Sequence, residues 1–208
     1  MIELHNVDCM EYMKTCEDNK FDLAIVDPPY NIVSQQKRGV GSRIDVSGKM
    51  NNWNNKSPTD EYFSELFRIS KDQIIWGANN YEGLPKTEYF CIWNKEQTVD
   101  NFASLEYAWI SNGIGKPAKM FTYSIHKHNA KKGAKIHPTM KPIKLYEWLL
   151  TKYAKPGQKI FDSHFGSLPI GIACHNLGFD LTACELDKDY FDAAKKRLEI
   201  HQMQKRWC

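Results

Sequence analysis

The stretch of the chain that decides the fold spans residues 159–202 and reads KIFDSHFGSLPIGIACHNLGFDLTACELDKDYFDAAKKRLEIHQ. Its apolar pattern predicts a strand at 159–162, a helix at 169–177, a strand at 179–185 and a closing helix at 187–202. Strands that alternate with helices over short connections are typical of a parallel sheet covered by helices. We therefore predict an α/β fold with a doubly wound, mostly parallel sheet.

The rest of the chain is expected to extend this sheet. Residues 21–26 form a near-continuous apolar run of the kind that is buried inside a parallel sheet. Further strands are expected at 2–4, 73–77, 89–93, 104–110 and 119–125, and further helices at 9–15, from 59 onward and at 143–153. We expect the strands at 104–110 and 119–125 to pair as an antiparallel hairpin at a sheet edge.

Length and composition limit the alternatives. A chain of 208 residues with 42% hydrophobic and 25% charged residues is typical of one globular domain, here residues 1–208. Its apolar stretches are too short to cross a membrane and Met1–His5 lack a signal-peptide pattern, so the cytosol is the expected location. Six cysteines without a Cys-x-x-Cys pair indicate neither a metal site nor a disulfide framework, and we expect Cys91, Cys174 and Cys184 to be buried.

The positive charge of the chain is concentrated in two segments. Residues 107–146 hold eight lysines and no acid, and residues 31–59 hold five basic residues against one acid, in a chain of net charge +3. Such a cationic surface suits a polyanion, and solvated lysine-rich loops are the alternative. Residues 31–58 form a polar segment too long for an ordinary connection, which predicts either a functional loop or a disordered segment. Residues 127–135 show no periodicity and are predicted as a mobile loop. The predicted nucleic-acid contacts are Lys37, Arg38, Arg43, Lys127, Lys131, Lys132 and Lys135.

Asp27-Pro28-Pro29-Tyr30 follows directly on the apolar run 21–26. An acid, two rigid prolines and an aromatic ring at the end of a buried strand suit a pocket for a flat base with an exocyclic amine. The alternative is a simple strand terminator, because proline cannot donate to the ladder and keeps the preceding residue extended. The motif by itself leaves both interpretations open.

A second constellation follows the strand at 159–162. The turn Ser163–Ser167 contains Gly166 and precedes a helix, so a ligand can approach its backbone N–H groups. About twenty residues further on, Glu185 and Asp187 end the next strand, where a doubly wound site binds ribose hydroxyls. The turn lacks the Gly-x-Gly-x-x-Gly and Gly-Lys-Ser/Thr patterns, which favours a nucleoside without a pyrophosphate, such as S-adenosylmethionine.

Four blocks along the chain resemble the amino-methylating DNA methyltransferases. They are Asp27-Pro28-Pro29-Tyr30, His137–Pro142, Phe161–Ser167 and Glu185-Leu186-Asp187. Their order resembles the group whose catalytic motif precedes its cofactor motif, the beta-class adenine-specific enzymes. The resemblance implies a Rossmann-like methyltransferase sheet with circularly permuted motifs, acting on double-stranded DNA.

The resemblance also implies roles for single residues. Asp27, Pro28, Pro29 and Tyr30 would be catalytic: the Asp27 carboxylate and the Pro28 carbonyl each accept one N–H of the amine, and Tyr30 stacks on a flipped-out base. Target recognition would lie at about 31–58 and 95–135, and no metal is implied. The residues implied to bind S-adenosylmethionine are Asp8, Cys9, Asp27, His137, Thr139, Lys141, Asp162, His164, Phe165, Gly166, Ser167, Glu185 and Asp187.

The chain departs from the family pattern at Leu168, where the family usually has glycine, and at Pro169. A side chain at 168 is expected near the backbone that contacts the cofactor. It therefore leaves open a nucleic-acid-binding module with a weak cofactor pocket. The acid at Asp27 favours adenine, with cytosine 4-amino or RNA methylation as alternatives. A homodimer and a cognate restriction enzyme are further open possibilities.

Overall fold

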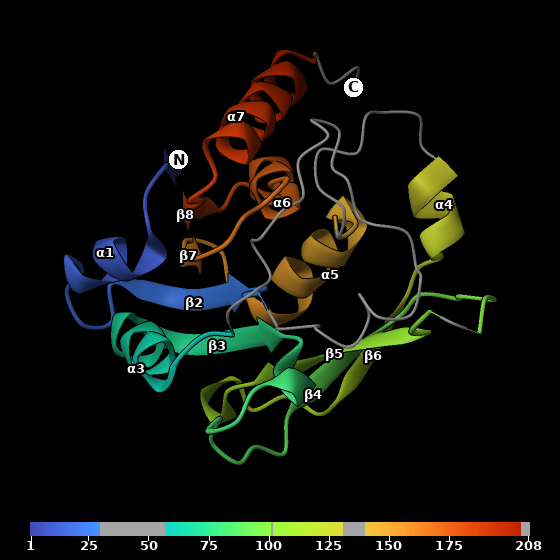
Figure 1. Ribbon diagram of the computed structural model, residues 1–208, viewed down its shortest axis with the longest axis horizontal. Coiled ribbons are helices and arrows are strands. Elements are labelled where there is room, and N and C mark those ends of the chain that lie inside the picture. The colour runs from blue at the N-terminus through green and yellow to red at the C-terminus, as the bar shows by residue number, and fades with distance from the viewer. Residues whose placement is uncertain (30–56, 101, 131–139, 205–208) are drawn as a thin grey trace.

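The computed structural model describes residues 1–29, 57–100, 102–130 and 140–204, which fold around one eight-stranded sheet (Figure 1). The strands are β1 (Ile2–His5), β2 (Phe21–Val26), β3 (Ser70–Trp76), β4 (Phe90–Asn94), β5 (Leu105–Ile110), β6 (Lys119–Thr122), β7 (Lys159–Asp162) and β8 (Asp180–Cys184). Their order across the sheet is β1-β8-β7-β2-β3-β5-β4-β6. Every pair of neighbours is parallel except the two that involve β5. The predicted α/β class and mostly parallel sheet are confirmed.

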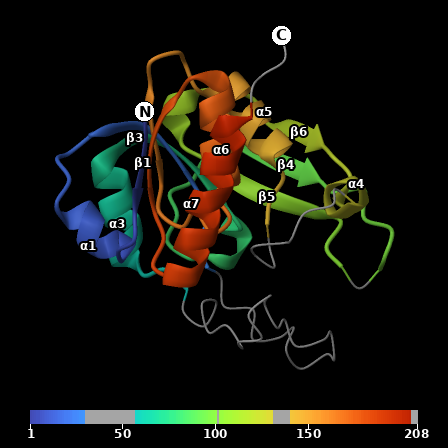
Figure 2. The same cartoon turned by 90° about the horizontal axis from the view of Figure 1, so that it is seen from above.

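Helices cover both faces of the sheet, as Figures 1 and 2 show. They are α1 (Cys9–Lys14), α3 (Asp60–Ile69), α4 (Ile125–Ala130), α5 (Ile143–Tyr153), α6 (Pro169–Leu177) and α7 (Lys188–Met203), with short 3-10 turns η1 (Ala78–Asn80) and η2 (Asn112–Ile114). Because side chains alternate along a strand, Leu23 and Ile25 of β2 pack with α5, α6 and α7, whereas Ala24 and Val26 pack with α1 and α3. None of the described helices has the length and apolar character needed to cross a bilayer.

The helices begin and end at residues that favour a helix boundary. The Asp8 carboxylate accepts the Met10 N–H at 2.7 Å and begins α1, and the Thr59 hydroxyl accepts the Tyr62 N–H and begins α3. Pro169 is the first residue of α6, where its missing N–H costs nothing. Gly178 ends α6 with φ 75°, a left-handed conformation that favours glycine.

The predicted hairpin of 104–110 with 119–125 is wrong. β5 pairs with β3 and β4, antiparallel to both, and β6 pairs with β4 in parallel at the edge of the sheet. The reason is burial: Ala108, Trp109 and Ile110 are buried, which suits a strand with neighbours on both sides. Lys119 and Met120 are exposed, which suits an edge strand.

Within the predicted loop at 127–135, the structure places residues up to 130 in helix α4, and residues 131–135 lie outside the described part. The three cysteines expected in the core are buried, which confirms that prediction. Burial raises the pKa of the Cys91 and Cys174 thiols to about 12, so both stay protonated at neutral pH.

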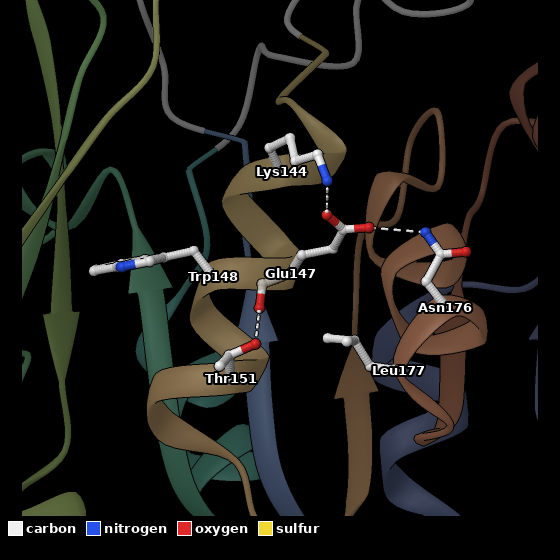
Figure 3. Close-up of a pocket in the computed structure, with 6 residues that line it drawn as sticks. All are labelled: Lys144, Glu147, Trp148, Thr151, Asn176 and Leu177. Atoms are coloured by element: carbon white, nitrogen blue, oxygen red, sulfur yellow. Dashed lines mark hydrogen bonds and ion pairs between the residues drawn. The ribbon is translucent and has the colours of Figure 1, made fainter.

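Helices α5 and α6 pack side by side and leave a surface pocket between them (Figure 3). Glu147 of α5 accepts from Lys144 at 2.7 Å and from Asn176 of α6 at 2.8 Å. The pocket is lined by Lys144, Glu147, Trp148, Thr151, Asn176 and Leu177. None of these residues belongs to the predicted site, so this pocket is a feature of helix packing.

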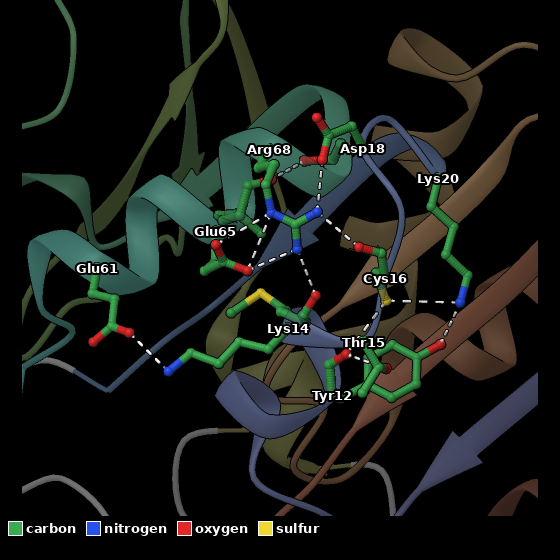
Figure 4. Close-up of polar contacts among 12 residues, drawn as sticks. Tyr12, Lys14, Thr15, Cys16, Asp18, Lys20, Glu61, Glu65 and Arg68 are labelled. Carbon is green, nitrogen blue, oxygen red and sulfur yellow. Dashed lines mark hydrogen bonds and ion pairs between the residues drawn. The ribbon is translucent and has the colours of Figure 1, made fainter.

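Arg68 of α3 fastens that helix to the segment between α1 and β2 (Figure 4). Its guanidinium donates to the Glu65 carboxylate, to Asp18 and to the backbone carbonyls of Met13 and Cys16, all at 2.7–2.8 Å at the shortest contact. The planar guanidinium can satisfy several acceptors at once, which a lysine ammonium does less well. These contacts hold α1 and the segment that follows it against α3.

Candidate active site

The predicted catalytic and cofactor motifs meet at one edge of the sheet, at the carboxyl ends of its parallel strands. β2 runs into Asp27, β7 ends at Asp162 and β8 runs into Glu185, and these three strands lie in the order β8-β7-β2. From β2 the chain continues through α3 on one face, and from β7 it continues through α6 on the other. The boundary between β7 and β2 is therefore a topological switch point, where doubly wound sheets bind ligands.

The turn after β7 is held by Glu185. One carboxylate oxygen of Glu185 accepts the Gly166 N–H at 2.9 Å, and the other accepts the Asp187 N–H at 3.0 Å. Gly166 has φ 51°, and the Phe165 N–H donates to the Cys184 carbonyl at 3.1 Å. Burial raises the pKa of Glu185, opposed by these N–H groups. The structure thus brings together the turn and the acid that the sequence placed about twenty residues apart.

Leu168, the departure from the family pattern, points into the core. It has φ 57°, unusual for a leucine, and its side chain is fully buried in the core. Gly171 accommodates it, because a Cβ at that glycine would come within 2.6 Å of the Leu168 Cγ. The Leu168 side chain therefore packs into the core, because Gly171 in α6 makes room for it, and its effect on cofactor binding stays a prediction.

Asp162 is almost completely buried at the end of β7. Its Oδ1 accepts the His164 N–H at 3.1 Å. Burial raises the pKa of Asp162 to about 8, and the nearby carboxylates of Asp27 and Glu185 act in the same direction. Three carboxyl groups thus gather at the switch point, an arrangement that favours a cationic ligand.

A chain of polar contacts connects this turn to α1 and α3. Tyr62 Oη lies 2.6 Å from Ser163 Oγ, which lies 2.8 Å from His164 Nδ1, and His164 Nε2 lies 3.7 Å from Cys9 Sγ. Burial lowers the pKa of His164 to about 4 and raises that of Cys9 to about 12, so both are neutral at physiological pH. Cys9 and His164 were predicted from the sequence, whereas Tyr62 was not, because only the packing of α3 brings it here.

Two acids assigned to the cofactor have visible structural roles. Asp8 begins α1, and Asp187 begins α7 by accepting the Asp189 and Tyr190 N–H groups at 2.9 and 3.0 Å. Ser167 is buried, and its carbonyl accepts from Arg197 at 2.6 Å. The predicted cofactor contacts of these residues stay predictions.

On the other side of the switch point, the two carboxylate oxygens of Asp27 differ in their hydrogen bonding. Oδ2 accepts from the Lys141 ammonium, whereas Oδ1 is buried and has no hydrogen-bond partner among the described residues. Burial raises the pKa of Asp27, and the nearby Lys141 opposes this. The Pro28 carbonyl accepts the Tyr81 hydroxyl at 2.6 Å, a contact that the sequence did not predict.

Lys141 lies beside Asp27, with its side chain 3% exposed. It also contacts the Glu106 carboxylate at 3.1 Å, and Glu106 in turn contacts Lys95 at 2.5 Å. The predicted contact of Lys141 with the cofactor's tail stays a prediction. Glu106 and Lys95 were not predicted, because their place in the site depends on how β4 and β5 pair.

Several predicted residues lie outside the described part of the chain. They are Tyr30, Lys37, Arg38, Arg43, Lys131, Lys132, Lys135, His137 and Thr139. Of the predicted nucleic-acid contacts, Lys127 is described, and it is exposed on α4.

The described residues form a Rossmann-like fold with a candidate ligand site at the carboxyl ends of its parallel strands. A family model described as DNA methylase, for N6 and N4 amino-methylating enzymes, matches residues 67–196. That is more than half of the chain, so the chain belongs to this family, which uses S-adenosylmethionine. The predicted family and the Rossmann-like fold are confirmed.

Known proteins resemble the chain over nearly its whole length. The type II methyltransferase M.HinfI of Haemophilus influenzae is 27% identical over 92% of this chain, which spans 66% of that protein. The M1.HpyAVI–SAM complex superposes with a TM-score of 0.59 and 19% identity, covering 95% of this chain and all of that one. The cytosine-N4-specific PvuII DNA methyltransferase gives 0.61 and 12%, covering all of this chain and 88% of that one. At these low identities, the two superpositions show that the folds are similar and no more.

Proposed function

We propose that this chain transfers a methyl group from S-adenosylmethionine to the exocyclic 6-amino group of an adenine flipped out of double-stranded DNA. The observation that carries the proposal is Asp27 Oδ1, a buried acceptor without a partner among the described residues, at the switch point beside the Gly166 turn. A buried unsatisfied carboxylate oxygen is costly unless a ligand completes it. An amine N–H is the natural donor for it.

The residues on the β7 and β8 side fit a cationic methyl donor. Asp162, Glu185 and Asp27 place three carboxyl groups at one edge. Burial raises the pKa of each, so a bound cation would be stabilised by drawing these groups into their ionised form. S-adenosylmethionine carries a sulfonium and an ammonium group, and when bound it supplies an electrophilic methyl group. Glu185 would hold the ribose hydroxyls with lone pairs that its two backbone contacts leave available, and Asp162 would face the cationic part.

The residues on the β2 side prepare the amine. Oδ1 of Asp27 and the carbonyl of Pro28 each accept one N–H, which turns the nitrogen lone pair away from the ring and toward the methyl group. The Pro28 carbonyl has a second lone pair for this purpose beside its contact with Tyr81. As the N–CH3 bond forms, the bond between the methyl carbon and the sulfonium sulfur would break and leave a neutral thioether. The nitrogen then carries a positive charge, which an ionised Asp27 stabilises, and Oδ1 of Asp27 would accept the proton that the nitrogen loses.

The choice of adenine rests on the acid at Asp27, which resembles the adenine-specific enzymes. Cytosine 4-amino methylation is the second candidate, since the fold is also similar to that of the cytosine-N4-specific PvuII enzyme. DNA contacts are proposed for Lys127 on α4 and for the basic residues of 31–58 and 131–135. A homodimer, a cognate restriction enzyme and a cytosolic location stay predictions.

The test is methylation of duplex DNA by the purified chain with isotopically labelled S-adenosylmethionine, followed by nucleoside mass spectrometry. We expect labelled N6-methyladenine. Labelled N4-methylcytosine would move the proposal to the second candidate. Calorimetry that detects no binding at millimolar S-adenosylmethionine would leave only a nucleic-acid-binding module.

A further inference from the structure

Four charged side chains form one cluster that includes Asp27, the proposed acceptor of the target amine. In order they are Asp27, Lys141, Glu106 and Lys95, joined by the three ion pairs described above. The Lys141 side chain is 3% exposed, and those of Lys95, Asp27 and Glu106 are 15%, 20% and 22% exposed. Two carboxylates and two ammonium groups balance in charge, as a poorly solvated cluster requires.

The reversed strand β5 is what brings Glu106 to this cluster. Glu106 is the second residue of β5 and is paired with Trp93 near the end of β4. Because β5 runs opposite to its neighbours, its beginning lies at the same edge as the ends of the parallel strands. Lys95 directly follows β4, and its N–H donates to the Ser104 carbonyl at 2.9 Å. If β5 ran parallel to its neighbours, Glu106 would lie at the opposite edge of the sheet, because it is near the beginning of the strand.

We propose that Glu106 and Lys95 are positioning residues: they hold the Lys141 ammonium between two carboxylates, so that Lys141 occupies only Oδ2 of Asp27 and leaves Oδ1 for the target amine. This inference rests on the proposed function, because it assigns a purpose to Oδ1. It concerns side chains that do not touch the amine themselves.

The physical reason is competition for one ammonium group. Without Glu106, Lys141 would be buried with Asp27 as its one anionic partner in the cluster, and both carboxylate oxygens would be drawn toward it. With Glu106 in place, the ammonium is shared, and Lys95 neutralises the far oxygen of Glu106. Asp27 then presents Oδ1 free of any partner among the described residues and in a fixed direction, which is preorganisation rather than added affinity.

The same cluster sets how readily Asp27 ionises. The negative charge of Glu106 raises the pKa of Asp27, and the positive charges of Lys141 and Lys95 lower it. Two further titratable side chains face the cluster, Asp162 at the end of β7 and Tyr146 on α5, and burial raises the pKa of both. Removing Glu106 or Lys95 should therefore move the pKa of Asp27 in opposite directions.

The test compares Glu106→Gln and Lys95→Gln with the unchanged enzyme in kcat against pH, at saturating S-adenosylmethionine and duplex DNA. For Glu106→Gln we expect kcat to fall about tenfold and the acidic limb to move to lower pH by about half a unit or more. For Lys95→Gln we expect a smaller loss and a shift of that limb to higher pH. Lys95→Arg keeps the charge and should restore the original profile.

Glu147→Gln is the matched control, since Glu147 also pairs with a lysine but lines the surface pocket between α5 and α6 and is not one of the four cluster residues. Thermal unfolding and cofactor affinity check that each variant folds. If Glu106→Gln does not fold, the Lys95 variants decide: a pH profile that shifts in Lys95→Gln and stays unchanged in Lys95→Arg supports the inference. Unchanged kcat and pH profiles in both charge-removing variants would overturn the inference. Full activity of Asp27→Asn would instead overturn the proposed function itself.

Discussion

The two halves of the active-site edge are built on different principles. On the β7 and β8 side, the turn around Gly166 and the acid Glu185 are connected mainly through backbone N–H groups and lie close together in sequence. On the β2 side, side chains from three segments far apart in sequence, at residues 27, 95–106 and 141, meet in an ion-pair cluster around Asp27 and Lys141. The first half, called the donor half, suits the binding of a methyl donor. The second, called the acceptor half, suits the orientation of the amine that accepts the methyl group. Substitutions in the two halves should therefore affect different steps.

The largest effect is expected on the acceptor half. Asp27→Ala removes the unpartnered oxygen and should lower kcat about a thousandfold. The affinity for DNA, measured by fluorescence anisotropy, should stay within a few fold. A wild-type rate of methylation in this variant would abolish the distinction between the two halves.

The next effect is expected on the donor half. Glu185→Ala removes the carboxylate that holds the Gly166 N–H and should weaken S-adenosylmethionine binding about a hundredfold. Isothermal titration calorimetry measures the Kd. Glu199→Ala on the exposed face of α7 is the control for loss of a carboxylate. An unchanged Kd for Glu185→Ala would contradict the assignment of the donor half.

A smaller effect tests the packing beneath the donor half. Gly171→Ala places a Cβ within 2.6 Å of the Leu168 Cγ and should cost about 2 kcal/mol of unfolding free energy. Urea denaturation measures it. In the double variant Leu168→Ala with Gly171→Ala, the added methyl meets a smaller neighbour, so the two losses should be less than additive. Strict additivity would show that the two residues are not coupled.

The smallest effect concerns the protonation of Asp162, whose pKa lies at about 8. A cationic ligand prefers the ionised form, so the affinity for S-adenosylmethionine should rise by up to about tenfold per pH unit below 8 and level off above it. The folded chain keeps a proton that the unfolded chain releases at its ordinary pKa, so stability should fall as pH rises from about 4 to 8. Asp162→Asn should flatten both dependences, and a persistent slope would assign them to another group.

The donor half was almost entirely predictable from the sequence. The strand at 159–162 and the helix at 169–177 occur as expected, because their apolar pattern and short connections leave few alternatives. The exception is Leu168, whose direction depends on the room that Gly171 provides on the next turn of α6. A departure from a motif therefore says little until its neighbour in space is known.

The acceptor half was predictable only in its first residue. The position of Asp27 after a buried strand identified it, whereas Glu106, Lys95 and Tyr81 carry no local pattern that marks them as part of a site. The wrong pairing expected for residues 104–110 has the same origin. Strand pairing depends on burial and on register across the sheet, and the spacing of residues along one strand determines neither.

The sequence by itself determined the parallel sheet, the two motifs at its carboxyl edge and the family to which the chain belongs. These follow from periodicity and from residues that lie close together along the chain. The tertiary structure alone decided that β5 runs in reverse, that Lys141 is shared by Asp27 and Glu106, and that Leu168 is buried in the core. Long-range contacts depend on the whole fold, because each is formed by segments that only the assembled sheet brings together.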